Sequence, residues 1–419
     1  EHADKSYGLN PQYGGYEISK GKYRLPGLPA MYGEGQEDAE TLKIRLTDQV
    51  SGLAVTLLYG VFPGYDIITR AVCVKNEGNG PAALKRVYSA CLDFLHGEYD
   101  LIQFYGRHAM ERNFQRTALC HGAQVIGSRR GTSSHQYNPG VILAGKNTNE
   151  DSGSCYGMLF VYSGNFLVEA EKDQYDQTRI QMGLTDELFA YPLEAGAEFT
   201  APEVILSYTN KGLSRLSQQY HHCIMNHICQ GKYVHANRPV LINSWEAAYF
   251  DFTGDTIVEL AKEAKALGID MVVMDDGWFR GRNSDTTSLG DWIEDQEKFL
   301  EGLQKLAEKV REKGVEFGIW FEPEMVSPES ELYKKHPDWV IRSKRYRPIR
   351  SRNQLVLDLA NPEVREYLIE ALSKILKNGN ITYVKWDMNR HLTDLGSAFL
   401  NRENQGELSH RYVLGLYSI

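Results

Sequence analysis

The stretch QLVLDLANPEVREYLIEALSKILKNGNITYVKWDMN, residues 354–389, decides the fold. Short apolar runs with the composition of buried strands stand at its two ends, and a long amphipathic pattern lies between them. That pattern has a helix start signal, because Asn361 is a good capping residue and Pro362 takes the first helical position. A strand, a helix and a second strand in this order predict a parallel β/α unit.

The same order recurs through the second half of the chain. PVLINSWEA (239–247), IDMVVMDDGW (269–278) and VEFGIWFEPE (315–324) have the composition of strands. Residues 255–268 and 299–314 are amphipathic helical patterns, and each ends at a glycine. Together with the strands of residues 354–389, these segments predict about five parallel strands between Val240 and Trp386.

Polar residues separate a closed barrel from an open doubly wound sheet. A barrel brings all its strand ends to one mouth, whereas an open sheet concentrates its chemistry at one switch point. No glycine-rich phosphate motif follows the first strand. We therefore predict a (β/α)8 TIM barrel, because polar side chains stand at the end of every strand: Trp245 and Glu246, Asp275 and Asp276, Trp320 with Glu322 and Glu324, Asp358, and Lys385 with Asp387.

The first half of the chain has a different pattern. All six tryptophans lie after residue 244, and the earlier part consists of short alternating runs such as TLKIRLTD (41–48), separated by turn clusters such as NEGNG (76–80). Alternation over short runs is typical of a β-sandwich. We predict a β-sandwich domain over 1–210, a helical linker over 211–238 and a partial barrel over 239–419.

Bulk composition limits the partners. The 419 residues carry a net charge of −9, so nucleic acid is not expected as a partner. The basic run RSKRYRPIRSR (342–352) fits a ligand loop or a solvated face. No membrane span or signal segment is found, and the six cysteines lack the spacing of a metal site, so we expect a cytoplasmic protein with reduced thiols.

Lys385 and Asp387 are two positions apart on a strand, so their side chains share a face. Inside a barrel, a carboxylate beside a lysine stays ionised, as a nucleophile or a sugar-binding acceptor must. The alternative is a structural ion pair in the packed layers of the barrel.

Other strand-end residues fit a carbohydrate site. The adjacent carboxylates Asp275 and Asp276 suit neighbouring hydroxyls; a metal site, or a helix cap at Asp276, is the alternative. Trp245 and Trp320 suit the apolar face of a sugar, although tryptophan is also a common core residue. The roles of Glu322 and Glu324 stay open, with a structural role favoured for Glu324.

Five ordered motifs carry a family resemblance: NSWEAAYFDF, MDDGWFRGRNSDTTSLGDW, FGIWFEPEMVSPESELYKKHPDW, RNQLVLDLANPEV and YVKWDMNR. They resemble the bacterial α-galactosidases (melibiases) of glycoside hydrolase family 36. The resemblance implies an N-terminal β-supersandwich before the barrel, and a retaining hydrolase of terminal α-linked galactose, as in melibiose and raffinose. It implies no cofactor and no metal, and a homo-oligomer, often a tetramer.

The resemblance also implies site residues by motif position. Asp387 would be the nucleophile that forms the glycosyl-enzyme intermediate. Lys385, Asp275 and Asp276 would hold the galactose hydroxyls. The rest of the site would be lined by Arg352, Trp245, Trp320 and Asn389.

A retaining mechanism needs a second carboxyl group as acid/base. In the family this is an aspartate on a later strand, in a motif resembling SDDTD, and the chain stops at LSHRYVLGLYSI before it. We expect a fragment, truncated at both ends, that alone is inactive or poorly folded. The alternatives are a galactosyl transferase or an α-N-acetylgalactosaminidase on the same scaffold, or a non-catalytic galactose-binding fragment.

Overall fold

The computed structural model describes residues 1–33, 35, 37–378 and 380–419. They divide into two compact units, one of Glu1–Val234 with Arg402–Val413, the other of His235–Asn401 with Leu414–Ile419. The domain boundaries expected from the sequence at residues 210 and 238 remain predictions. Within the described part, no helix combines the length and the apolar composition needed to cross a membrane.

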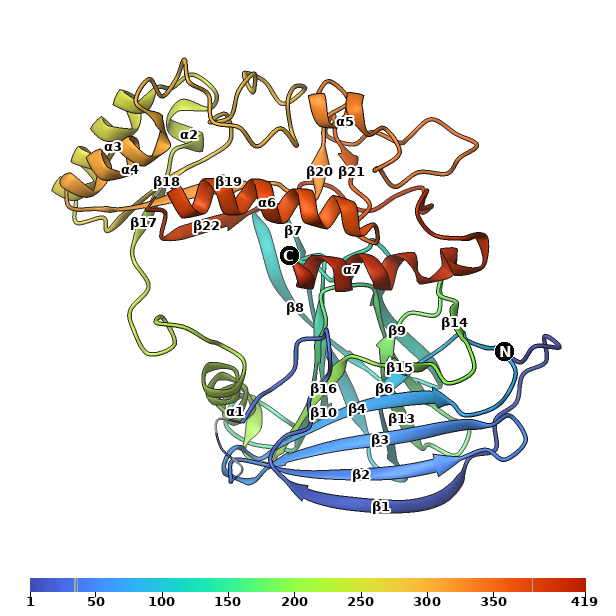
Figure 1. Ribbon diagram of the computed structural model, residues 1–419. Helices are drawn as coiled ribbons and strands as arrows, with labels where there is room; N and C mark the ends of the chain where they lie inside the picture. Colours follow the sequence, from blue (N-terminus) through green and yellow to red (C-terminus); the bar gives the residue numbers. More distant parts are fainter. Residues whose placement is uncertain (34, 36, 379) are drawn as a thin grey trace. The chain divides into compact units, whose positions relative to one another are not determined.

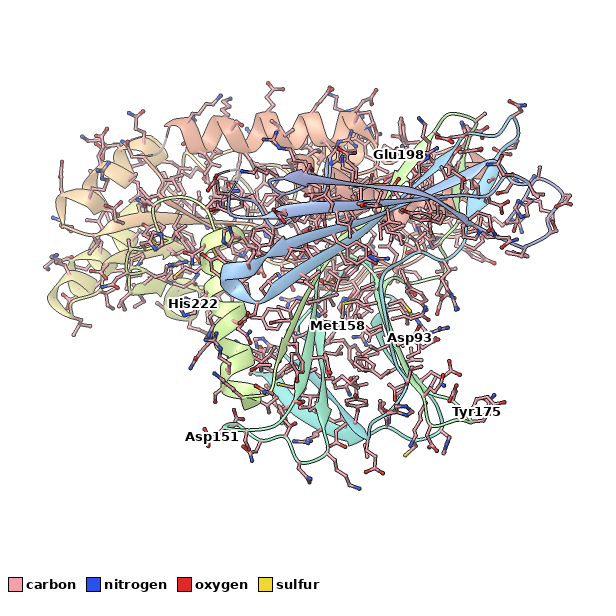
Figure 2. All side chains as sticks on the ribbon, turned by 90° about the horizontal axis from the view of Figure 1, so that it is seen from below. Asp93, Asp151, Met158, Tyr175, Glu198 and His222 are labelled. Atoms are coloured by element: carbon pink, nitrogen blue, oxygen red, sulfur yellow. The ribbon has the colours of Figure 1, made fainter. Side chains whose placement is uncertain are left out.

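Antiparallel strands dominate the first unit, as the alternating runs predict (Figure 1). Met158 lies in the interior of the strands, whereas Asp151 and Tyr175 lie on connections at the edge of this unit (Figure 2). The long sheet has the order β1 (Gln12–Lys20), β2 (Glu40–Thr47), β3 (Leu53–Phe62), β4 (Ile67–Asn76), β16 (Glu203–Thr209), β11 (Cys155–Val161), β10 (Tyr137–Gly145), β7 (Tyr99–Arg107) and β8 (Met110–Ala118), and β15 (Glu198–Thr200) also pairs with β4.

Shorter sheets complete the first unit. Helix α1 (Gly212–His227) packs on β16 and β11 and buries Leu216, Tyr220 and Cys223, which confirms the helix predicted after residue 211. The other elements are the sheet β12 (Phe166–Lys172), β13 (Thr178–Leu184) and β6 (Tyr88–Phe94), the pair β14 (Tyr191–Leu193) and β5 (Ala82–Leu84), β9 (Gly122–Ser128) beside β12, and the short helices η1 (Pro63–Tyr65) and η2 (Arg402–Glu407).

The second unit is built on a parallel sheet. Its central strand β18 is MVVM, and all four of these residues are buried, as expected for a strand that is covered on both faces. This sheet is part of a TIM barrel, as predicted. Its order is β17 (Leu241–Asn243), β18 (Met271–Met274), β19 (Glu316–Phe321) and β22 (Tyr383–Trp386).

The predicted count of five parallel strands is wrong by one among the described residues, where four form the sheet. The remaining segment does form a strand, β21 (Leu355–Val356), but it pairs antiparallel with β20 (Met325–Val326). A run as short as LVLDL carries no signal for its partner, because both kinds of buried strand have the same apolar composition.

Helices cover the sheet as predicted. Helices α3 (Gly254–Ala266) and α4 (Gly302–Glu312) pack together and against β18 and β19 respectively (Figure 1). Helix α6 (Pro362–Asn378) begins at the predicted proline, and the Asn361 side chain accepts the Glu363 N–H at 3.0 Å. The unit also holds α2 (Trp245–Ala248) and α5 (Glu331–Lys335), and helix α7 (Leu408–Ser418) has residues in both units.

Candidate active site

Several of the polar residues predicted at strand ends lie at one edge of the parallel sheet in the second unit. Because the strands run parallel, their carboxyl ends lie on the same side. Trp320 of β19 is the register partner of Lys385 of β22, and Asp275 directly follows β18. Their side chains take part in two sets of hydrogen bonds at this edge: Lys385 and Asn243 both donate to Asp275, and Trp320 donates to Asp387.

Asp275 is a buried carboxylate with two donors on one oxygen. Lys385 Nζ donates to Asp275 Oδ2 at 2.8 Å, and Asn243 Nδ2 donates to the same oxygen at 2.6 Å. Asp275 is 4% exposed, and its backbone N–H is bonded to Ser244 Oγ. The Lys385 side chain therefore extends from β22 across β19 to the end of β18. The other carboxylate oxygen, Asp275 Oδ1, accepts the backbone N–H of Asp276.

Asp276 is held by a buried arginine from the following loop. Arg282 donates from Nε to Oδ1 at 3.0 Å and from Nη2 to Oδ2 at 2.8 Å, and its side chain is only 1% exposed. Burial raises the pKa of the Asp276 carboxyl, while the hydrogen bonds and the charge of Arg282 oppose the rise. This bidentate geometry fixes the plane of the Asp276 carboxylate.

Asp387 is oriented by donors to both of its oxygens. Trp320 Nε1 donates to Oδ2 at 3.1 Å and Asn389 Nδ2 donates to the same oxygen at 2.8 Å. The Met388 N–H donates to Oδ1 at 3.1 Å. Lys385 is bonded to Asp275 and Asp387 to Trp320, so the shared face of Lys385 and Asp387 stays a prediction.

Arg352 extends the site from the basic run. Its Nη1 donates to Asn389 Oδ1 at 3.1 Å. Arg352 and Asn353 have φ values of 50° and 59°, and Ser351 and Gln354 exchange backbone hydrogen bonds across them. Positive φ at both central residues is the geometry of a type I′ turn, which arginine rarely adopts. The turn places the guanidinium group of Arg352 beside Asn389.

Glu322 is a buried carboxyl group next to this cluster. The Asn389 N–H donates to its Oε1 at 2.7 Å, and Gln354 Nε2 donates to its Oε2 at 2.8 Å. Burial raises the pKa of Glu322 to about 7, these hydrogen bonds oppose the rise, and the negative charge of Asp387 adds to it. The open question about Glu322 is answered in part: it contacts the residue that orients Asp387.

Other strand-end residues lie apart from the cluster. The ring of Trp245 packs edge-on against Tyr249 and Phe250, with ring centres 5.1 Å away in both cases, and only its backbone N–H contacts the network, through Asn243. Asp358 is buried and accepts from Ser397 and from the Ala360 N–H, and Glu324 accepts from Trp386 Nε1. Asp358 and Glu324 thus make contacts that support the local structure.

Sequence reasoning missed Asn243 and Arg282. Asn243 is the last residue of β17, so it also stands at a strand end. Only Trp245 and Glu246, which follow it closely, were interpreted as site candidates. Arg282 lies in a loop with no periodic pattern, and nothing in the local sequence pairs it with Asp276. For the predicted metal alternative, the described residues contain no group of three or more His, Cys, Asp or Glu side chains placed to bind a metal ion.

Comparison with known families gives two matches that together span nearly the whole chain. Residues 198–419 match the family model described as Melibiase, and residues 1–194 match the Glycosyl hydrolase family 36 N-terminal domain. The Melibiase range contains the parallel unit together with β15, β16 and α1, and the N-terminal range lies within the antiparallel unit.

Individual relatives carry the same likeness. The bifunctional alpha-galactosidase/sucrose kinase AgaSK of Mediterraneibacter gnavus is 59% identical over 402 residues, which are 96% of this chain and 42% of that protein. Alpha-galactosidase AgaA of Geobacillus stearothermophilus is 47% identical over 97% of this chain and 56% of that protein. The chain thus spans about half the length of these curated relatives.

Solved structures agree with the fold. The crystal structure of AgaA superposes with a TM-score of 0.98 at 46% identity and covers 100% of this chain and 58% of that one. The galactosidase domain of AgaSK gives a TM-score of 0.94 at 58% identity, over 98% of this chain and 56% of that one. Variants of AgaA have been solved in complex with raffinose and with stachyose.

Proposed function

Because the chain belongs to glycosyl hydrolase family 36, we propose that this protein is an α-galactosidase that removes terminal α-linked galactose from oligosaccharides such as melibiose and raffinose. The observation that carries the proposal is the oriented carboxylate Asp387, which lies beside the Lys385–Asp275 pair at the ends of parallel strands. The raffinose and stachyose complexes of a relative support this substrate class.

We assign Asp387 as the nucleophile of a retaining mechanism. Its carboxylate attacks the anomeric carbon, the bond to the leaving group breaks, and water later releases galactose from the covalent ester. Hydrogen bonds from Trp320 and Asn389 to Oδ2 hold the carboxylate in one orientation, so little reorganisation is needed during attack. An ionised carboxylate also stabilises the positive charge that develops on the sugar ring.

The other cluster residues are assigned to galactose binding. Buried carboxylates that accept sugar hydroxyls discriminate strongly, because a mismatched hydroxyl leaves them without a partner. Asp275 and Asp276 take this role, with Lys385 as a further donor and Trp320, Arg352, Asn389 and Trp245 lining the site. A retaining mechanism also needs an acid/base carboxyl group, and we assign that role to none of these residues. The intact enzyme is proposed to be a cytoplasmic homotetramer that needs no cofactor.

Turnover of the intact protein tests the proposal. Melibiose and raffinose should release galactose, and proton NMR of the first product should show the α-anomer, as retention requires. A 2-fluoro galactosyl fluoride should add one sugar mass to the peptide that contains Asp387. Release of the β-anomer, or label on another peptide, would contradict the assignment. Hydrolysis of an α-N-acetylgalactosaminide would indicate an α-N-acetylgalactosaminidase. Transfer of galactose to an added sugar acceptor would indicate a galactosyl transferase.

Lys385→Met should lower kcat/KM for α-galactosides. The change leaves the buried Asp275 without its cation, and truncating one partner of such a pair costs about 2–5 kcal/mol. Because the Lys385 side chain is 38% exposed, we expect the lower end, a fall in kcat/KM of roughly 30-fold. The effects of Lys385→Met and Asp275→Asn should be less than additive. Lys334→Met, which removes the surface pair with Glu331, is the control; additive effects would refute the coupling.

A further inference from the structure

Glu322 lies one hydrogen bond away from the residue that orients the nucleophile. Its Oε1 accepts the Asn389 backbone N–H at 2.7 Å, and the Asn389 side chain donates to Asp387 Oδ2 at 2.8 Å. Glu322 is therefore linked to Asp387 through a single residue whose backbone it holds and whose amide touches the attacking carboxylate.

Glu322 is badly placed to protonate a leaving group. It is only 1% exposed, and both of its oxygens accept donors from this chain, one from Asn389 and one from Gln354. A general acid must come within hydrogen-bond reach of the oxygen that it protonates. The contacts of Glu322 thus fit a residue that acts on its neighbours rather than on the sugar.

Gln354, which is bonded to Glu322, can form a hydrogen bond with either the ionised or the protonated carboxyl group. Gln354 is 3% exposed, and its Oε1 is buried with no hydrogen-bond partner among the described residues. Rotating this amide by half a turn exchanges its nitrogen and its oxygen. In one orientation Gln354 donates to ionised Glu322; in the other its oxygen can accept the O–H of protonated Glu322. In both cases Glu322 Oε1 still accepts the Asn389 N–H.

We propose that Glu322 is a positioning residue whose ionised form holds Asn389 against Asp387 and speeds galactosyl transfer to Asp387, while its protonated form, bonded to Gln354, is slower. The inference rests on the proposed function of the site. The group that it assigns is a second carboxyl that neither touches the sugar nor acts as the acid/base.

The surroundings of Glu322 shift its pKa upwards. Burial raises its pKa to about 7, and the Asp387 charge contributes to the rise. Two arginines are bonded to the partners of Glu322: Arg390 Nη1 donates to the Gln354 backbone oxygen, and Arg352 donates to Asn389. Glu324 on the same segment is bonded to Trp386, and Lys385 on β22 is bonded to Asp275. A pKa of about 7 makes both the ionised and the protonated form of Glu322 accessible near neutral pH.

Two effects make the ionised form the faster one. A hydrogen bond to a charged acceptor is stronger than one to a neutral acceptor, so ionised Glu322 holds Asn389 more firmly. A second negative charge near Asp387 also favours a reaction in which Asp387 loses its charge to a covalent bond while the sugar ring becomes positive. Both effects disappear when Glu322 takes up a proton.

Glu322→Gln removes the negative charge of the side chain but keeps its size and shape. The new amide can accept the Asn389 N–H and donate to a rotated Gln354, so the contacts of the protonated form are reproduced. Wild-type kcat/KM on melibiose should fall roughly fivefold from pH 8 to pH 6, because the charged hydrogen bond is worth about tenfold in rate and about a tenth of Glu322 is still ionised at pH 6. The variant should lack this pH-dependent fall, come within about twofold of the wild type at pH 6 and be about tenfold slower at pH 8.

Two further variants complete the test. Glu324→Gln changes a neighbouring buried carboxyl group, and kcat/KM of this variant should still change near pH 7 as in the wild type. Gln354→Met removes a donor that stabilises ionised Glu322, so the pH-dependent fall should move to higher pH; this variant decides the matter if Glu322→Gln does not fold. A wild-type profile without the fall, or an unchanged fall in Glu322→Gln, overturns the inference. All of these variants are made in the intact protein, and absence of turnover by the intact wild type on any α-galactoside instead refutes the proposed function.

Discussion

Asp387→Asn in the intact protein is expected to lower kcat on the order of 10⁴-fold, because removal of a nucleophile that acts as part of a unit commonly costs this much or more. Sugar binding should persist, since Asn can still accept the hydrogen bonds from Trp320 and Asn389 through its carbonyl oxygen. Stopped assays with an aryl α-galactoside measure the loss, and calorimetry with galactose measures binding.

The control for this variant is Asp358→Asn. Asp358 also follows a strand and is buried, but it accepts from Ser397 and the Ala360 N–H outside the cluster. The amide oxygen can keep the Ala360 N–H, but the amide nitrogen cannot accept the Ser397 O–H, so some stability is lost. Neither contact involves the cluster, so kcat of the folded variant should stay within about threefold of the wild type. Asp387→Gly with added azide should form β-galactosyl azide, as the small anion attacks from the vacated face. Retained turnover by Asp387→Asn would refute the nucleophile assignment.

Arg282→Met is expected to destabilise the fold and abolish tight galactose binding. Removing one partner of a buried ion pair costs about 3–5 kcal/mol, because the other charge stays buried without compensation. Arg282 and Asp276 are both almost fully buried, so this range applies in full. Thermal unfolding should show the loss as a lower Tm, and calorimetry should show weaker galactose binding, since Asp276 is no longer held in one plane.

The pH dependence of this variant has a defined sign. Burial raises the pKa of Asp276 and Arg282 opposes the rise, so the pKa increases further in Arg282→Met. Between the unfolded and the folded pKa the folded protein binds more protons, and stability therefore falls as pH rises through this window. The stability deficit of Arg282→Met should be smallest in acidic buffer and reach its full size towards neutral pH.

Two neighbours serve as references for Arg282. Arg280→Met changes an exposed residue of the same loop and should alter stability by less than about 0.5 kcal/mol. Arg282→Lys keeps the charge but loses the bidentate geometry, so it should lie between the wild type and Arg282→Met. An equal Tm for Arg280→Met and Arg282→Met would show that the buried pair does not support this site.

Much of the candidate site was accessible from local patterns. Asp275, Asp276, Lys385 and Asp387 were placed at strand ends because the apolar runs before them mark where each strand stops. The cap of α6 at Asn361 was predicted for the same reason, since capping depends on a few consecutive residues. The family resemblance added Arg352 and Asn389, whose contact with each other the structure provides.

Local periodicity was enough to determine which segments become strands and helices, and which side chains stand where a strand ends, because these properties depend on neighbours within a few positions. Pairing depends on residues far apart in the chain. Lys385 meets Asp275 across 110 positions, Gln354 meets Glu322 across 32, and β21 joins β20 instead of the parallel sheet. Only the packed fold decides such contacts, because burial and distance, and not residue type, select the partner of each charge.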